Sequence, residues 1–412
     1  MTAGPPPGST GGTLLFTFTG ADSPGVVADL LDAISQQDEE VLDVGQIAVR
    51  GNLTVTLQVT ARSDPAVLRS ALGAVSRAHG LSLGVLADPV DSTPARVGRA
   101  SVVVMGAPLR SGALAAIAAC ITGHGARVER IRRLVSHPVT ALDFEVSGAQ
   151  IATLRETLAV AAALHAVDIA VSPGGLHRRG RRLLVMDVDS TLIQDEVIEL
   201  LAAHAGVEAQ VAAITDRAMR GELDFEQSLH ARVALLAGLP ESVLGDVRAS
   251  ARLTPGAETL VRTVKRLGFT VAVVSGGFIE IVGPLAAGLG IDHAQANVLE
   301  MRDGRLTGRV TGTLVDRAEK ARALRRFAAE AGVPLSRTVA VGDGANDLDM
   351  LAIAGLGIAF NAKPVVRAEV RASVSVPHLD AVLYLLGITK DEIDDAEGYA
   401  DPDTDSLDSA HA

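Results

Sequence analysis

Two carboxylates stand two positions apart at the end of an apolar run. Asp187 and Asp189 follow Leu183–Met186, and side chains two positions apart in a strand lie on the same face. Such like charges repel each other unless a cation lies between them. Asp343, in the stretch GDGAND, adds a third carboxylate after a second apolar run. Hard oxygen ligands suit Mg²⁺, so we expect Mg²⁺ at these three aspartates. The alternative is a pair of strand-terminal aspartates that cap the next helix.

Three further stretches could bind an anion. The hydroxyl and backbone N–H groups of Ser275–Gly277, at a strand-to-helix turn, could form an anion cradle, although this stretch is also an ordinary turn. Lys320 begins a helical segment and could contact a phosphate or lie in solvent. The stretch Gly342–Asp347 includes Asn346. Its spacing of Gly, Asp and Asn residues is unusual, which makes it a more specific indication of a functional site than the other two.

These groups need elements that bring them together. Apolar runs at 183–188, 269–277, 337–344 and 356–360 alternate with helical segments such as 256–268 and 319–332, which predicts an α/β domain with a parallel sheet covered on both faces. In open sheets of this kind ligands bind outside the carboxyl ends of the strands. The pattern at 196–253 is helical without a strand, and we expect it to form a cap over the site.

The first half of the chain contains an internal repeat. Residues 13–93 and 97–175 each read as strand, helix, two strands, helix and strand, with Gly20 and Gly106 at the ends of the two first strands. The βαββαβ order predicts two ferredoxin-like modules. An Arg-rich linker leads into the α/β domain at 181–390. Residues 1–12 and 391–412 are expected to be disordered tails.

Composition excludes several classes of protein. The formal charge is −12, but nine acidic residues without Lys or Arg lie within 391–412, which leaves −3 for the rest and no basic footprint for nucleic acid. Cys120, the only cysteine, excludes a disulfide framework and a thiolate metal cluster. We see neither a signal peptide nor an apolar run long enough to span a membrane, and we expect a soluble cytoplasmic protein.

The order Asp-x-Asp-x-Thr, Ser, Lys and Gly-Asp-Gly-x-Asn-Asp resembles the haloacid dehalogenase superfamily. The resemblance implies that Asp187 is the nucleophile, which forms an aspartyl phosphate, and that Asp189 is the general acid and base. It also implies that Ser275 and Lys320 hold the phosphoryl oxygens, with Mg²⁺ as cofactor. The expected substrate-binding residues of this domain include Gly276, Gly277 and Asn346.

Four residues of the expected cap limit the class of substrate. A substrate with an ammonium and a carboxylate would need one carboxylate and one guanidinium, and Glu196 and Arg232 can supply both; each could instead be a solvated cap residue. The spacing of Glu196, Met219, Phe225 and Arg232 resembles the phosphoserine phosphatase family. That resemblance implies O-phospho-L-serine as substrate, with Met219 and Phe225 closing over it, and the last step of serine synthesis.

The N-terminal modules resemble ACT domains, and the tandem pair is similar to the layout in some actinobacterial phosphoserine phosphatases. This implies an effector site at Gly20, Asp22 and Gly106, with L-serine as the expected ligand, and a homodimer through residues 13–175. The second module lacks the Asp-x-Pro-Gly of the first, so a scaffold without ligand remains open. The substrate could also be another small phosphate ester or a phosphoprotein, and the reaction could be phosphotransfer to an alcohol. A different class of protein, an amino-acid sensor whose phosphatase half is vestigial, is open as well.

Overall fold

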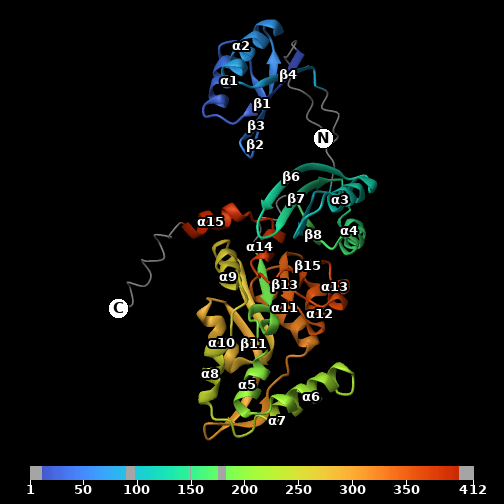
Figure 1. Cartoon of the computed structure of the whole chain (residues 1–412), viewed down its shortest axis with the longest axis vertical. Coiled ribbons are helices and arrows are strands. Elements are labelled where there is room, and N and C mark those ends of the chain that lie inside the picture. The colour runs from blue at the N-terminus through green and yellow to red at the C-terminus, as the bar shows by residue number, and fades with distance from the viewer. Residues whose placement is uncertain (1–11, 90–97, 149, 175–181, 399–412) are drawn as a thin grey trace, which may run out of the picture. The chain divides into compact units, whose positions relative to one another are not determined.

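The computed structural model describes residues 12–89, 98–148, 150–174 and 182–398 (Figure 1). The chain divides into two compact units, Met1–Ala95 and Arg96–Ala412, and each is described by itself. Residues 1–11 and 399–412 of the expected tails, and most of the expected linker, lie outside the described residues. Within those described, no helix has both the length and the apolar character needed to cross a bilayer.

The first unit is a ferredoxin-like module. Its antiparallel sheet has the order β2-β3-β1-β4, and alternate residues of β1 such as Phe16 and Phe18 are fully buried against helix residues such as Leu30 and Leu68. This period of two is what a sheet with helices on one face requires. The elements are β1 Gly12–Ala21, α1 Val26–Ser35, β2 Val41–Val49, β3 Asn52–Ala61, α2 Pro65–Ala78 and β4 Ser82–Ala87.

The second unit begins with the repeat of this module. The sheet order is β6-β7-β5-β8, and the elements are β5 Ala100–Gly106, α3 Ser111–Gly123, β6 Arg127–Val135, β7 Thr140–Ser147, α4 Ile151–His165 and β8 Asp168–Pro173. In β5, Val102 and Val104 belong to the core beneath the helices. Val103 and Met105 alternate with them and belong to the core of the α/β domain that follows. The second sheet face is therefore covered by the chain itself.

The α/β domain is built on a seven-stranded sheet with the order β12-β11-β10-β9-β13-β14-β15. Strands β11, β10, β9, β13, β14 and β15 are paired in parallel, and β12 is antiparallel to β11. The predicted fold class is confirmed. The strands are β9 Leu183–Met186, β10 Thr270–Phe278, β11 His293–Arg302, β12 Arg305–Thr311, β13 Thr338–Gly342, β14 Leu356–Phe360 and β15 Ala372–Val374.

Helices flank this sheet and follow its strands. They are α9 Ala257–Arg266, α10 Ile279–Gly288, α11 Arg317–Glu330, α12 Leu348–Ile353, α13 Pro364–Glu369, α14 Ala381–Leu385 and α15 Lys390–Gly398, with short helical turns η2 Val188–Leu192, η3 Leu335–Arg337 and η4 Ala345–Asp347.

The start of the acidic tail was expected to be disordered. This prediction is wrong for residues 391–398, which belong to helix α15. The side chain of Thr389 accepts from Glu392 N (3.1 Å), and the Glu392 carboxylate accepts from Thr389 N (2.7 Å) and Thr389 Oγ1 (2.8 Å). This local capping offsets the acidic composition.

The insertion between β9 and β10 is helical, as its sequence pattern predicts. It contains α5 Val197–Ala205, α6 Glu208–Met219, α7 Phe225–Ala234 and α8 Ser242–Ser250, and α5, α6 and α7 gather at one end of the sheet (Figure 1). Helix α7 starts with a capping box between Asp224 and Gln227. Gly308 of β12, at φ +79°, lies so close to the C-terminal end of α7 that an added Cβ would meet Ala234 O at 3.1 Å, and Ala237 Cβ just beyond the helix at 2.9 Å. The β11–β12 hairpin thus braces the cap.

Candidate active site

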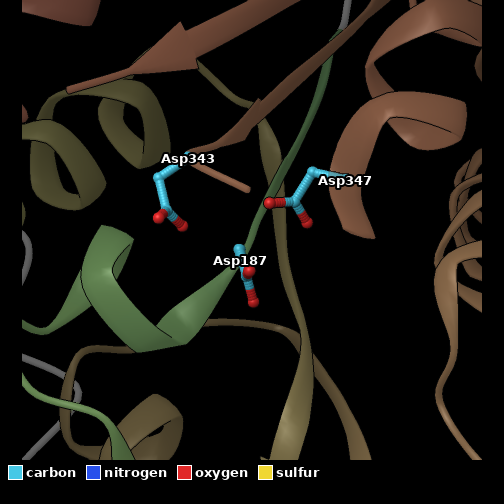
Figure 2. Close-up of side chains that lie close together, drawn as sticks. All are labelled: Asp187, Asp343 and Asp347. Atoms are coloured by element: carbon cyan, nitrogen blue, oxygen red, sulfur yellow. The ribbon is translucent and has the colours of Figure 1, made fainter. Parts of the chain in front are cut away.

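Three carboxylates meet at the carboxyl edge of the sheet. Asp187 follows β9, Asp343 follows β13, and Asp347 ends η4; one oxygen of each lies within 4.8 Å of the others. Figure 2 shows Asp343 and Asp347 on either side of Asp187. The expected metal set is Asp187, Asp189 and Asp343. Asp187 and Asp343 belong to the described cluster, whose third carboxylate is Asp347, and the place of Asp189 in the metal set stays a prediction. An all-oxygen set with this excess of negative charge fits Mg²⁺.

A buried lysine joins two of these carboxylates. Lys320 Nζ lies 2.6 Å from Asp187 Oδ2 and 2.7 Å from Asp347 Oδ1, and its side chain is 1% exposed. Burial alone would lower the pKa of Lys320, but the two carboxylates outweigh it and raise that pKa. Burial, and then Asp347, raise the pKa of Asp187 well above its usual value, with Lys320 opposing them. One ammonium facing three carboxylates leaves negative charge that a divalent cation would compensate.

Asp189 faces a different set of groups. Its Oδ1 accepts from Val197 N (3.0 Å), at the start of α5, and its Oδ2 accepts from Ser275 Oγ (3.3 Å). Burial, followed by the charge of Glu196, raises the pKa of Asp189 to about 7. A carboxyl group with this pKa can act as an acid and as a base near neutral pH. Ser190, at φ +56°, turns the chain sharply after it, which fits the local strain often found at functional sites.

The irregular end of β10, Ser275–Gly277, supplies hydrogen-bond donors. Ser275 Oγ accepts from Gly277 N (2.7 Å), and Gly276 and Gly277 line a cavity of about 190 Å³. A Cβ on Gly277 would lie 3.0 Å from Asp189 Oδ2 and from Ser275 Oγ, so glycine allows the backbone to approach the acid closely. Asn346 lines the same cavity, and so does Asp343. Burial, followed by Asp347, raises the pKa of Asp343 to about 6.

The cap closes the other side of this cavity. Glu196, Phe225 and Arg232 line it, and Glu196 accepts from Ser190 Oγ (2.7 Å). Arg232 donates weakly to Ser228 O (3.3 Å). Met219 ends α6, but its side chain lies outside what the structure describes.

Sequence reasoning did not identify several lining residues, which are Ile198, Leu229 and Phe278. Leu229 could have been found from periodicity, because Phe225, Leu229 and Arg232 are spaced four and three apart on one helix and therefore share a face. Asp347 is the last residue of the GDGAND stretch, and its place in this motif could have predicted that it lies at the site. Ile198 and Phe278 could have been suggested only by their closeness in the sequence to the predicted site residues Glu196 and Gly277.

The proposed effector residues lie in the two modules. Gly20 is near the end of β1, where an added Cβ would meet Leu81 Cδ2 at 2.7 Å, and Asp22 N donates to Gly51 O (2.9 Å). Gly106 ends β5. Gly20 and Gly106 thus lie near or at the ends of equivalent strands, and a ligand site at these residues stays a prediction.

Comparison with known proteins agrees with this geometry. Residues 184–352 match the family model for haloacid dehalogenase-like hydrolases, and residues 12–85 and 99–172 match ACT domain models. A phosphoserine phosphatase of Streptomyces coelicolor is 58% identical over 94% of this chain and 95% of its own length. The chain belongs to the phosphoserine phosphatase family.

Other members of this family and its structural relatives extend the match. The phosphoserine phosphatase SerB2 of Mycobacterium tuberculosis is 48% identical over 93% of this chain and 95% of its own. A probable phosphoserine phosphatase from Vibrio cholerae has 35% identity and a TM-score of 0.55 over 72% of this chain and 89% of its own. A HAD family hydrolase from Salmonella enterica serovar Typhi has 28% identity and a TM-score of 0.60 over 70% of this chain and 98% of its own.

Proposed function

We propose that this chain hydrolyses O-phospho-L-serine to L-serine and phosphate through an aspartyl phosphate on Asp187. The observation that carries the proposal is one cavity with two unlike walls. One wall holds Asp187, Asp189 and the Gly276–Gly277 backbone, and the cap wall holds Glu196 and Arg232. The first wall suits a phosphoryl group, and the second suits an amino acid.

In the first step a carboxylate oxygen of Asp187 attacks phosphorus and the bond from phosphorus to the serine oxygen breaks. Asp189, protonated, donates its proton to that leaving oxygen. In the second step Asp189, now ionised, takes a proton from water as the water oxygen attacks phosphorus, and the bond to Asp187 breaks. The pKa of about 7 for Asp189 makes both protonation states accessible. The cycle returns both carboxyl groups to their starting states.

Charge in the transferring group needs compensation. Lys320 Nζ, which contacts Asp187, and the hydroxyl of Ser275 supply donors on the protein side. Mg²⁺, held by Asp187 and Asp343 with Asp347 beside them, would neutralise developing negative charge on the phosphoryl oxygens. Proposed side-chain ligands are thus Asp187 and Asp343, while the Asp189 carboxylate is reserved for proton transfer.

The cap supplies substrate selectivity. Glu196 would pair with the substrate ammonium, and Arg232 would hold its carboxylate through the two parallel N–H groups of the guanidinium. Phe225, together with Met219, would help to exclude water from the reacting centre. A cavity of about 190 Å³ fits a small phosphate ester better than a folded phosphoprotein.

Regulation and assembly belong to the same proposal. The two ACT domains would bind an amino acid, with L-serine as the expected ligand, and would contribute to a homodimer. Because the second face of the β5–β8 sheet is already covered within the chain, pairing between copies would rely on strand edges and on the first module.

The direct test is phosphate release from O-phospho-L-serine by the full chain, with Mg²⁺ and after its removal by a chelator. We expect turnover that requires the metal and exceeds turnover of homoserine phosphate. Transfer to an added alcohol that exceeds release to water would indicate a phosphotransferase instead, and absence of turnover on every small ester would support an amino-acid sensor.

A further inference from the structure

A fully buried amide lies behind the proposed phosphoryl site. Asn297, in β11, is 0% exposed and does not line the cavity described above. Its Nδ2 donates to Gly276 O (2.8 Å), and its Oδ1 accepts from Val315 N (2.9 Å). The two partners fix the orientation of the amide, because the reverse orientation would set donor against donor and acceptor against acceptor.

The first partner is the turn that carries Ser275. Parallel pairing between β10 and β11 is regular up to Val274, opposite Gln295, and resumes at Phe278, opposite Asn297. Three residues of β10 therefore face one residue of β11, and the Ser275–Gly277 stretch bulges from the ladder. Bulges re-aim groups near active sites, and here the Asn297 side chain supplies a hydrogen bond to the backbone of the bulge.

The second partner leads to Lys320. Val315 is directly followed by Asp316, whose side chain accepts from Glu319 N (2.6 Å) and caps α11. Lys320 N donates to Asp316 O (3.0 Å), so the lysine sits in the first turn. A bond that fixes Val315 therefore fixes the position at which α11 begins, and with it the base of the Lys320 side chain.

Strand β11 holds α11 at a second point. Gln295 Nε2 donates to Glu319 Oε1 (3.0 Å), one residue before Lys320. Leu299 N donates to Glu280 Oε1 (3.0 Å) in the first turn of α10, the helix that follows the Ser275–Gly277 bulge. The alternate residues 295, 297 and 299 thus tie β11 to both flanking helices, and Asn297 is the member that bonds to both site-bearing segments.

We propose that Asn297 is a positioning residue, which sets the separation between the Ser275–Gly277 bulge and the Lys320 helix so that both can bind one phosphoryl group. The inference rests on the proposed phosphatase function, because it assigns a role for that same site. A displacement of about 1 Å in groups that orient a reacting centre can reduce the rate by about 10²-fold.

The test uses Asn297→Leu in the full chain, because leucine has the same branching at Cγ and makes neither bond. Asn297→Thr is the second variant, since threonine suits a strand and keeps a hydroxyl if leucine prevents folding. Thr338→Val is the matched control: Thr338 is 1% exposed and also makes two hydrogen bonds, to Leu335 O and from Gly355 N, at the opposite end of the sheet. Assays measure kcat/KM for phosphoserine and for p-nitrophenyl phosphate, the inhibition constant of inorganic phosphate, and Tm.

We expect the folded Asn297 variant to lose about 10²-fold in kcat/KM on both substrates equally, because both share only the phosphoryl group. Inorganic phosphate should inhibit the Asn297 variant more weakly than it inhibits wild type. Thr338→Val should lower Tm without changing kcat/KM or the inhibition constant of phosphate. Unchanged kcat/KM in a folded variant overturns the inference, and so does a loss confined to phosphoserine. A wild-type chain that hydrolyses p-nitrophenyl phosphate but not phosphoserine would refute the proposed substrate and leave the Asn297 comparison intact on the other ester.

Discussion

Lys320 Nζ lies 2.6 Å from Asp187 Oδ2, with both side chains buried. The lysine therefore contacts the proposed nucleophile and also compensates Asp347. Removing one partner of a buried ion pair leaves an uncompensated charge, which typically costs about 3–5 kcal/mol. This pairing predicts that stability and binding of the proposed Mg²⁺ depend on each other.

We expect Lys320→Met to abolish turnover and to lower stability in chelator by about 3–5 kcal/mol. Mg²⁺ should raise the Tm of this variant more than that of wild type, because the cation would then be the remaining compensation for the carboxylates. Thermal unfolding at increasing Mg²⁺ measures the difference. Equal shifts in the two proteins would show that the cation does not share charge compensation with Lys320.

Asp187→Asn tests the nucleophile. An amide does not form the acyl phosphate, so turnover should vanish, while the fold is kept because the substitution removes one of several crowded negative charges. Incorporation of phosphate into the protein, followed after acid quench, should be detectable in wild type and absent in the variant. Normal turnover by Asp187→Asn would sink the mechanism.

Asp189→Asn separates proton transfer from stability. General acid–base catalysis contributes about 10²–10⁴-fold, so we expect a loss of that size. In wild type, the pKa of Asp189 is raised to about 7. Between about pH 4 and 7 the native state therefore binds more protons than the unfolded state. Stability from wild-type Asp189 is thus present below its unfolded pKa and is lost as pH rises through 7.

The variant should consequently be more stable than wild type at pH 8, by up to about 4 kcal/mol, and this advantage should shrink toward pH 4. Urea unfolding in chelator at both pH values gives the comparison. A stability difference that does not change with pH would mean that Asp189 keeps an ordinary pKa in the folded protein.

Arg232→Lys tests substrate selectivity. Lysine retains the charge but loses the planar pair of donors, so kcat/KM for phosphoserine should fall by about 10-fold or more, as expected for about 1.4 kcal/mol or more of lost binding. Hydrolysis of p-nitrophenyl phosphate, which lacks the carboxylate, should change little. The two substrates are assayed side by side, and equal losses would place Arg232 in a structural role.

The sequence predicted the elements with regular patterns and missed those whose residues face mixed surroundings. Strand β9 is apolar at every position and was found. Strand β11 reads HAQANVLEMR, and its polar residues Gln295 and Asn297 bond to buried partners from distant segments. Such residues resemble loop residues until the fold supplies those partners. The β11–β12 hairpin, and with it Asn297, therefore needed the structure.

The predicted site was recoverable because its groups follow apolar strands in the chain. Glu196, Phe225 and Arg232 line one cavity with Asp187, although nothing local in the sequence measures that distance. The place of Asp347 in the carboxylate cluster was the part that the sequence did not predict. Alternation places Asp187 and Asp189 on one face only while the strand continues, and β9 ends at Met186. The turn that follows sends the Asp189 carboxylate to Val197 N and Ser275 Oγ instead.

The ACT regulation proposal requires a truncation that leaves the phosphatase intact. A chain starting near Arg181 would remove Val103 and Met105 from the core that they share with Leu379 and Leu383. It would also remove Asp168, which is buried and accepts from Ser375 N (2.8 Å). Each exposed aliphatic side chain would cost roughly 1.5–3 kcal/mol. A chain starting at Arg96, the beginning of the second compact unit, avoids this loss.

We expect the chain from Arg96 to hydrolyse phosphoserine at close to the full-chain rate, and to need higher L-serine for half inhibition if Gly20 and Asp22 contribute to the effector site. A ligand shifts an equilibrium only if it binds one state better than the other, whereas product inhibition at the active site needs no ACT domain. Asp22→Ala in the full chain is the matched variant and should move serine inhibition in the same direction. Half inhibition at one serine concentration in all three proteins would show that the first ACT domain is not the sensor, and would leave assembly as its proposed role.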